Sequence, residues 1–273
     1  MTLIFFALLL PGARPAFAAE QHSLAVYISN GQSAYKQTVR LAEGTQLNHV
    51  APAKDKWLII NGLLNRDSDG QGLLSLQYQL ELSGGPNGQG RSIQVLSEAA
   101  IRPGDQLTVV ECGPWTVKLE LDSVKTAAKK SRGTAWNPGG LPNYRLTANV
   151  SAGSSRQQCK HVSRAGVQSN VADSITEGAK KFGFILNSLL SPADDGRSFS
   201  LLYQLEHGSN GAARPLQIQS EETLILNKKT VIPGEGYRLE LLLEGKTPPK
   251  QAASDNVVKS DPINEHGTVQ FLK

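Results

Sequence analysis

Several short patterns in this sequence could support chemistry, and the most suggestive is an acidic stretch at residues 65–70. Its order, Asn-Arg-Asp-Ser-Asp-Gly, resembles the start of a calcium-binding loop, in which carboxylate and amide oxygens bind the hard cation. Such a loop needs a glutamate at its twelfth position, and that position is Leu76, inside a predicted strand. A polar Asp-Gly turn therefore explains the pattern.

The patterns that could support catalysis are also incomplete. Ser33-Ala34-Tyr35-Lys36 fits the serine–lysine element of penicillin-recognising enzymes, but the accompanying Ser-Asp-Asn and Lys-Thr-Gly elements are absent. Glycines at 84, 85, 88 and 90 lie between two predicted strands, which favours a hairpin turn over a phosphate loop. The histidines are scattered singly: His22, His49, His161, His207 and His266. We therefore predict no enzyme activity, no cofactor and no metal site.

Two cysteines, Cys112 and Cys159, are the remaining reactive groups. They are too far apart in sequence for a redox motif. In an exported chain, an isolated pair favours a disulfide, and two separate buried thiols are the alternative.

The N-terminus predicts export. An apolar run from Leu3 to Leu10 is followed by Ala16-Phe17-Ala18, which predicts a signal peptide over residues 1–18, although no lysine or arginine precedes the run. No apolar run in the sequence is long enough for a transmembrane helix, which needs about 20 residues. We expect a periplasmic or secreted protein.

The charge pattern argues against a nucleic-acid partner. The formal net charge is only +4 and is spread along the chain, whereas nucleic-acid binders concentrate basic residues on one face. One basic cluster lies in a predicted loop together with Trp136, and Tyr144 follows at the start of a strand. Packing and solvation explain these residues well, but they are also the candidate partner contacts: Lys129, Lys130, Arg132, Trp136 and Tyr144.

Self-comparison indicates an internal duplication. Segments of the first half match segments of the second half in the same order: 60–64 with 186–190, 69–70 with 195–196, 76–81 with 201–206, 91–98 with 214–221, and 117–121 with 237–241. The spacing is domain-sized, so we predict two tandem β domains after the signal peptide, at 19–152 and 153–273.

Each half has the pattern of a β-sandwich. Residues 74–82 alternate between apolar and polar side chains, and further short strands are separated by Gly/Pro turns. Residues 115–124 and 144–150 are expected to form a hairpin with a long loop, and helix is not excluded at 169–179. We predict a mainly β fold made of two β-sandwich-like domains.

These features favour a non-enzymatic envelope protein that binds a protein partner, within a secretion, pilus or surface-assembly system. The expected plan resembles that of periplasmic pilus-assembly chaperones in architecture, without any sequence motif of theirs. The alternative is an exported protein that binds carbohydrate or another small ligand, and a hydrolase with dispersed residues ranks behind both. The sequence predicts no oligomeric state.

Overall fold

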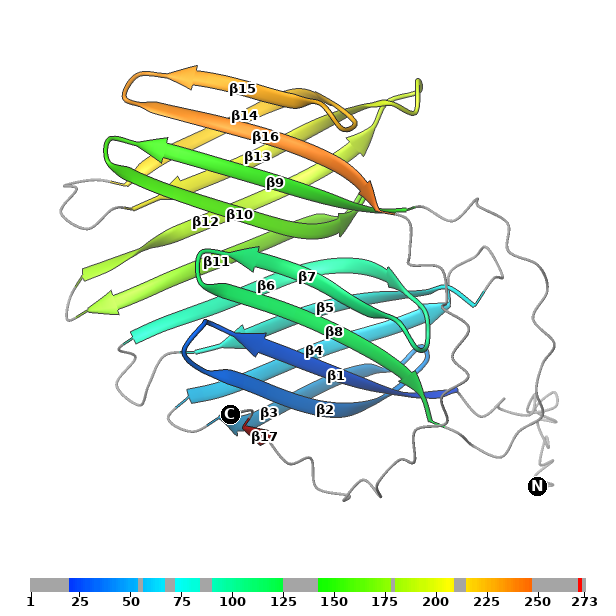
Figure 1. Ribbon diagram of the computed structural model, residues 1–273. Helices are drawn as coiled ribbons and strands as arrows, with labels where there is room; N and C mark the ends of the chain where they lie inside the picture. Colours follow the sequence, from blue (N-terminus) through cyan, green and yellow to red (C-terminus); the bar gives the residue numbers. More distant parts are fainter. Residues whose placement is uncertain are drawn as a thin grey trace, which may run out of the picture.

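The computed structural model describes residues 20–53, 56–66, 72–83, 90–124, 142–177, 180–208, 215–246 and 270–271. These residues form an all-β fold of two stacked antiparallel sheets (Figure 1), which confirms the predicted fold class at the level of mainly β. No helix that could cross a membrane occurs in the described ranges. The predicted signal peptide at 1–18 lies outside them.

The sheets run the full length of the molecule. One contains, in spatial order, β15 (Lys229–Gly234), β16 (Tyr237–Lys246), β9 (Asn143–Ala152), β10 (Ser155–Arg164), β7 (Gln106–Cys112), β8 (Trp115–Ser123), β1 (Gln21–Ser29), β2 (Ala34–Ala42) and the short β17 (Gln270–Phe271). The other contains β14 (Leu216–Ile225), β13 (Ser198–His207), β12 (Lys180–Pro192), β11 (Gln168–Glu177), β6 (Gly90–Ile101), β5 (Leu74–Leu82), β4 (Lys56–Arg66) and β3 (Gln46–Ala53). We call this second layer the eight-stranded sheet.

Alternating side chains explain why these segments form strands around one core. In β5, Leu76, Tyr78 and Leu80 are buried between the sheets, while Gln77 and Gln79 point outward. The same alternation recurs along the sheets and produces a single apolar cluster that includes residues from both ends of the chain.

The strand order of β9 to β16 repeats that of β1 to β8. Each set contributes four neighbouring strands to each sheet, in corresponding order. β9 pairs with β10 and β16 rather than with β8, so the hairpin expected between residues 115–124 and 144–150 is wrong. The predicted boundary at 152/153 falls in the β9–β10 turn, and both sheets continue across it. The division into two domains and the duplication stay predictions.

The two sets of strands meet where β7 pairs with β10 and β6 pairs with β11, and we call this junction the seam. The seam carries many buried polar contacts. Asp173 of β11 accepts hydrogen bonds from Arg91 Nε at 2.8 Å and from Trp115 Nε1 at 2.9 Å, both on the other side of the seam. Arg164 likewise contacts Glu98 at 3.1 Å. Polar pairing therefore joins the halves in addition to apolar packing.

Candidate functional site

Most of the predicted partner contacts lie outside the described residues: Lys129, Lys130, Arg132 and Trp136. The remaining candidate, Tyr144, is the second residue of β9 and is only 9% exposed. Its ring packs edge-on against Phe199, with 4.8 Å between the ring centroids. Burial raises the pKa of its hydroxyl. This position gives Tyr144 a core contact, and a contact with a partner stays a prediction.

The predicted cysteine pair is brought together at the seam. Cys112 and Cys159 are fully buried and directly opposite each other in β7 and β10, as free thiols. Gly113 N donates to Gln158 O at 3.1 Å, so the adjacent cysteines form a non-hydrogen-bonded pair. Cα atoms of such pairs are about 4.5 Å apart, within the range of about 4.4 to 6.8 Å that a disulfide spans. Burial raises the pKa of the Cys159 thiol, and the disulfide stays a prediction.

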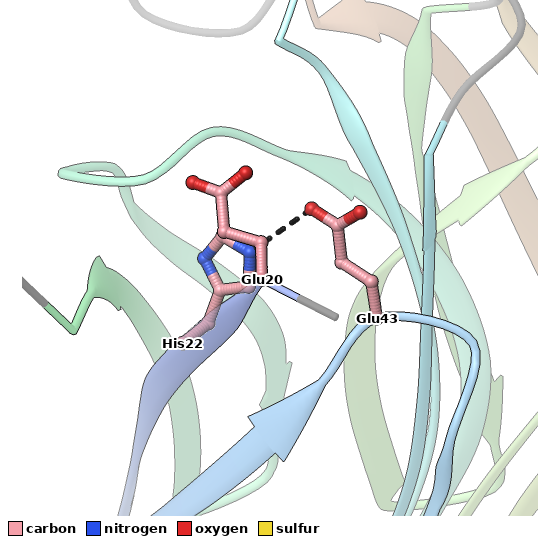
Figure 2. Close-up of side chains that lie close together, drawn as sticks. All are labelled: Glu20, His22 and Glu43. Carbon is pink, nitrogen blue, oxygen red and sulfur yellow. Dashed lines mark hydrogen bonds and ion pairs between the residues drawn. The ribbon is translucent and has the colours of Figure 1, made fainter. Parts of the chain in front are cut away.

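A cluster of Glu20, His22 and Glu43 is the group whose ligand atoms could hold a metal, since these atoms lie within 4.8 Å of one another. Figure 2 shows both carboxylates beside the His22 ring, which contacts Glu43 at 3.2 Å. Arg66 pairs with Glu43 at 2.7 Å and with Glu20 at 2.9 Å, which raises the pKa of its guanidinium. The two carboxylates thus share a single guanidinium, and the arrangement is that of an ion-pair cluster.

Two serine–histidine contacts have the residue types of a catalytic pair. His161 Nε2 lies 2.9 Å from Ser169 Oγ, but the site is fully enclosed and burial lowers the pKa of His161 to about 4. Ser155 Oγ lies 2.8 Å from His207 Nε2 at the partly buried end of β13. In both histidines, Nδ1 has no hydrogen-bond partner among the described residues. A serine hydrolase needs a group there to orient its base, so neither pair has the geometry of a triad.

Among the strands that the structure describes, the longest open edge belongs to β14. Gly208 N donates to Gly183 O at 2.8 Å, which fixes the alternation across β12, β13 and β14. By this alternation, even-numbered residues of β14 bond to β13, and the backbone groups of odd-numbered residues point away from the sheet. These outward positions are Gln217, Gln219, Glu221, Thr223 and Ile225.

A row of side-chain amides crosses the outer face of the eight-stranded sheet. The cross-strand partners, from β3 to β14, are Asn48, Asn61, Gln79, Leu96, Asn170, Asn187, Gln204 and Gln219. We call this set the amide row; seven of its members carry amides, and the β6 member is Leu96. Each member is exposed or half-buried. The alternation within one strand predicts its outward polar residues, but the row could not be predicted from the sequence, because its members come from eight strands whose register no local pattern reveals.

A shallow hollow of about 220 Å³ lies on this face in the second half. Its lining includes Asn187, Gln204 and Gln219 of the amide row, together with Leu189 and Leu202. Exposed Leu202 and half-buried Leu189 give the hollow an apolar margin beside polar groups.

Comparison with known proteins found no match: no family model, no curated protein and no solved structure is similar to this chain.

Proposed function

We propose that this chain is a non-enzymatic, exported binding protein of the cell envelope that takes a protein partner by strand addition at β14. The observation that carries this proposal is the open edge of β14, whose outward backbone groups run from Gln217 to Ile225. An extended segment of a partner can form main-chain hydrogen bonds along such an edge.

The other terminal strands offer shorter edges. Ser83 N donates to Trp57 O between β5 and β4, which fixes the hydrogen-bond alternation of β4 and of its other neighbour, β3. By this alternation the backbone of Pro52 in β3 points away from the sheet, and proline has no N–H to donate there. The six-residue β15 has Pro233 near its end. β17 already pairs with β2 at Lys36. These features favour β14 as the place where a partner adds.

The side chains around β14 indicate the partner's chemistry. Ile225 is 44% exposed on β14, and Val231 is 41% exposed on β15. Glu221 and Glu222 add negative charge near the middle of the strand. A segment with apolar residues at one end and a basic residue further along would complement this edge.

Thr223→Pro tests the proposal. Thr223 points its N–H outward, so proline there removes a donor that the sheet does not use, and its ring obstructs an added strand. We expect recovery of the partner in a cross-linked pull-down from the host envelope to fall about tenfold. Recovery would be quantified by mass spectrometry against the unsubstituted chain.

Val50→Pro is the matched control, because Val50 occupies an outward position on the opposite edge, in β3. Partner recovery should be unchanged by this substitution. Equal losses in both variants, or capture that survives Thr223→Pro in a folded chain, would overturn strand addition at β14. Thermal melting would establish that both variants are folded.

A further inference from the structure

We infer that the amide row is a binding site for an extended, uncharged polysaccharide, independent of strand addition at β14. The row crosses all eight strands, so at about 4.8 Å between neighbouring strands its members span roughly 34 Å. This is a linear array of amides at a regular spacing, interrupted by Leu96 in β6, and such an array suits a ligand made of similar units.

The chemistry of the row matches hydroxyl groups. A side-chain amide carries two donors and an acceptor, and a sugar hydroxyl both donates and accepts. Part of this capacity is used within the row: Asn61 donates to Gln79 at 3.2 Å, and Asn187 donates to Gln204 at 3.5 Å. These contacts hold the amides in place, while each amide keeps donor or acceptor capacity for a ligand.

The charges beside the row select against anionic glycans. The neighbouring cross-strand positions on the outer face include Glu81 and Glu206 on one side and Glu221 on the other. A carboxylated or sulfated chain would meet like charges there. A protein interface would instead be expected to present aromatic or arginine anchors, and the row has none.

The hollow at the second half supplies a place for one sugar ring. Its volume of about 220 Å³ is below the range of about 300 to 1,000 Å³ for drug-sized ligands. Leu202 is 47% exposed at its margin, where the apolar face of a ring could pack. Asn187, Gln204 and Gln219 line this hollow from three neighbouring strands, so a ligand in it would meet amide groups.

The test is affinity electrophoresis of the folded chain in dextran, laminarin and galactomannan, with alginate as the anionic comparison. We expect retardation by at least one neutral polysaccharide and none by alginate. Asn187→Ala with Gln204→Ala should weaken that binding at least about tenfold, because two ligand hydrogen bonds are lost. Asn187→Asp, which preserves side-chain shape, provides a second variant and should also weaken binding.

The control pair lies on the other sheet, where Gln158 donates to Asn149 at 2.7 Å in an exposed cross-strand contact. Asn149→Ala with Gln158→Ala should leave binding within twofold. Absence of binding to all three neutral polysaccharides, binding to alginate alone, or equal losses in both double variants would overturn the inference. Thr223→Pro should not affect polysaccharide binding, so this site and the β14 edge can fail separately.

Discussion

The seam and the free ends of the sandwich occupy corresponding places in the strand order, yet they carry different side chains. Asp173, which pairs across the seam, corresponds to Ala51 in the free strand β3. Cys112 and Cys159 correspond to Gly234 in β15 and Gln37 in β2. The corresponding strands therefore carry Asp173 and the two cysteines at the seam and lack these groups at the free ends.

The backbone hydrogen-bond donors also differ between the seam and the free ends. Glu111, whose backbone faces β10 in the seam, corresponds to Pro233 in β15, and Ser174 of β11 corresponds to Pro52 in β3. Proline lacks the N–H that a ladder needs, and edge prolines oppose pairing with another chain. The seam therefore has the backbone donors that strand pairing needs, whereas the prolines of β15 and β3 oppose pairing with a further strand.

The largest effect is expected at the cysteine pair. A disulfide between Cys112 and Cys159 would close a loop of nearly 50 residues and stabilise the fold by about 4 kcal/mol in the chain-entropy model. Urea unfolding of the oxidised chain and of a Cys112→Ala, Cys159→Ala variant would measure this difference. The reduced chain should unfold close to the variant. Mass spectrometry that finds two free thiols after refolding in a glutathione redox buffer would contradict the prediction.

Asp173→Ala should lower the free energy of unfolding by about 3 kcal/mol, because it leaves Arg91 and the Trp115 indole N–H without their buried acceptor. The matched control is Glu111→Ala, which removes an exposed seam pair with Lys160 at 3.4 Å and should cost under about 0.5 kcal/mol. Urea unfolding at neutral pH measures both. Equal losses would show that the buried pair has no special role in the seam.

His161 makes the seam sensitive to pH. Burial lowers its pKa to about 4, so the unfolded chain binds more protons below pH 6.5 and stability falls as pH falls. Between pH 8 and pH 5 we expect a loss of about 2 kcal/mol from this residue. The corresponding residue in the first half is Val39, which does not titrate. His161→Gln should flatten the dependence, and an unchanged slope would contradict the assignment.

The smallest effect on stability is expected from Pro52→Thr with Pro233→Thr, within about 0.5 kcal/mol. The double variant restores backbone donors at two free edges and should self-associate with rising concentration in sedimentation velocity. Pro103→Thr, in the β6–β7 turn, is the control and should behave like the unsubstituted chain. If all three chains sediment alike, the edge prolines do not protect the ends.

Local patterns were sufficient to predict much of the fold. The alternation at residues 74–82 matches β5, and the predicted strand at 115–124 matches β8. Residues 169–179 were ambiguous, and most of them form β11. Its inward positions include the polar Ser169 and Asp173, which hid the alternation. They are polar because they face the seam, and a single strand does not reveal that context.

The pairing of strands that are distant in sequence could not be predicted from the sequence. The β6–β11 pairing joins residues 90–96 to residues 170–176, and no local signal predicts such a register. The sequence match of 117–121 with 237–241 differs from the structural correspondence. Trp115 and Tyr237 occupy the same place in corresponding hairpins, so Val117 corresponds to Leu239. Trp57, near the start of β4, is 54% exposed. The amide row and the open edge of β14 depend on these registers, so they required the structure.

Hydrogen exchange distinguishes β6, which pairs across the seam, from β14, whose outer edge is open. In β6, the backbone N–H groups of Gln94 and Leu96 face β11 across the seam. The corresponding residues of β14 are Gln217 and Gln219, whose backbone N–H groups point away from the sheet. We predict slow exchange in β6 and fast exchange in β14 of the free chain, with β14 alone becoming protected when a captured envelope partner is present. Slow exchange in β14 of the free chain would contradict an open edge at β14, and no change when the partner is bound would contradict strand addition there.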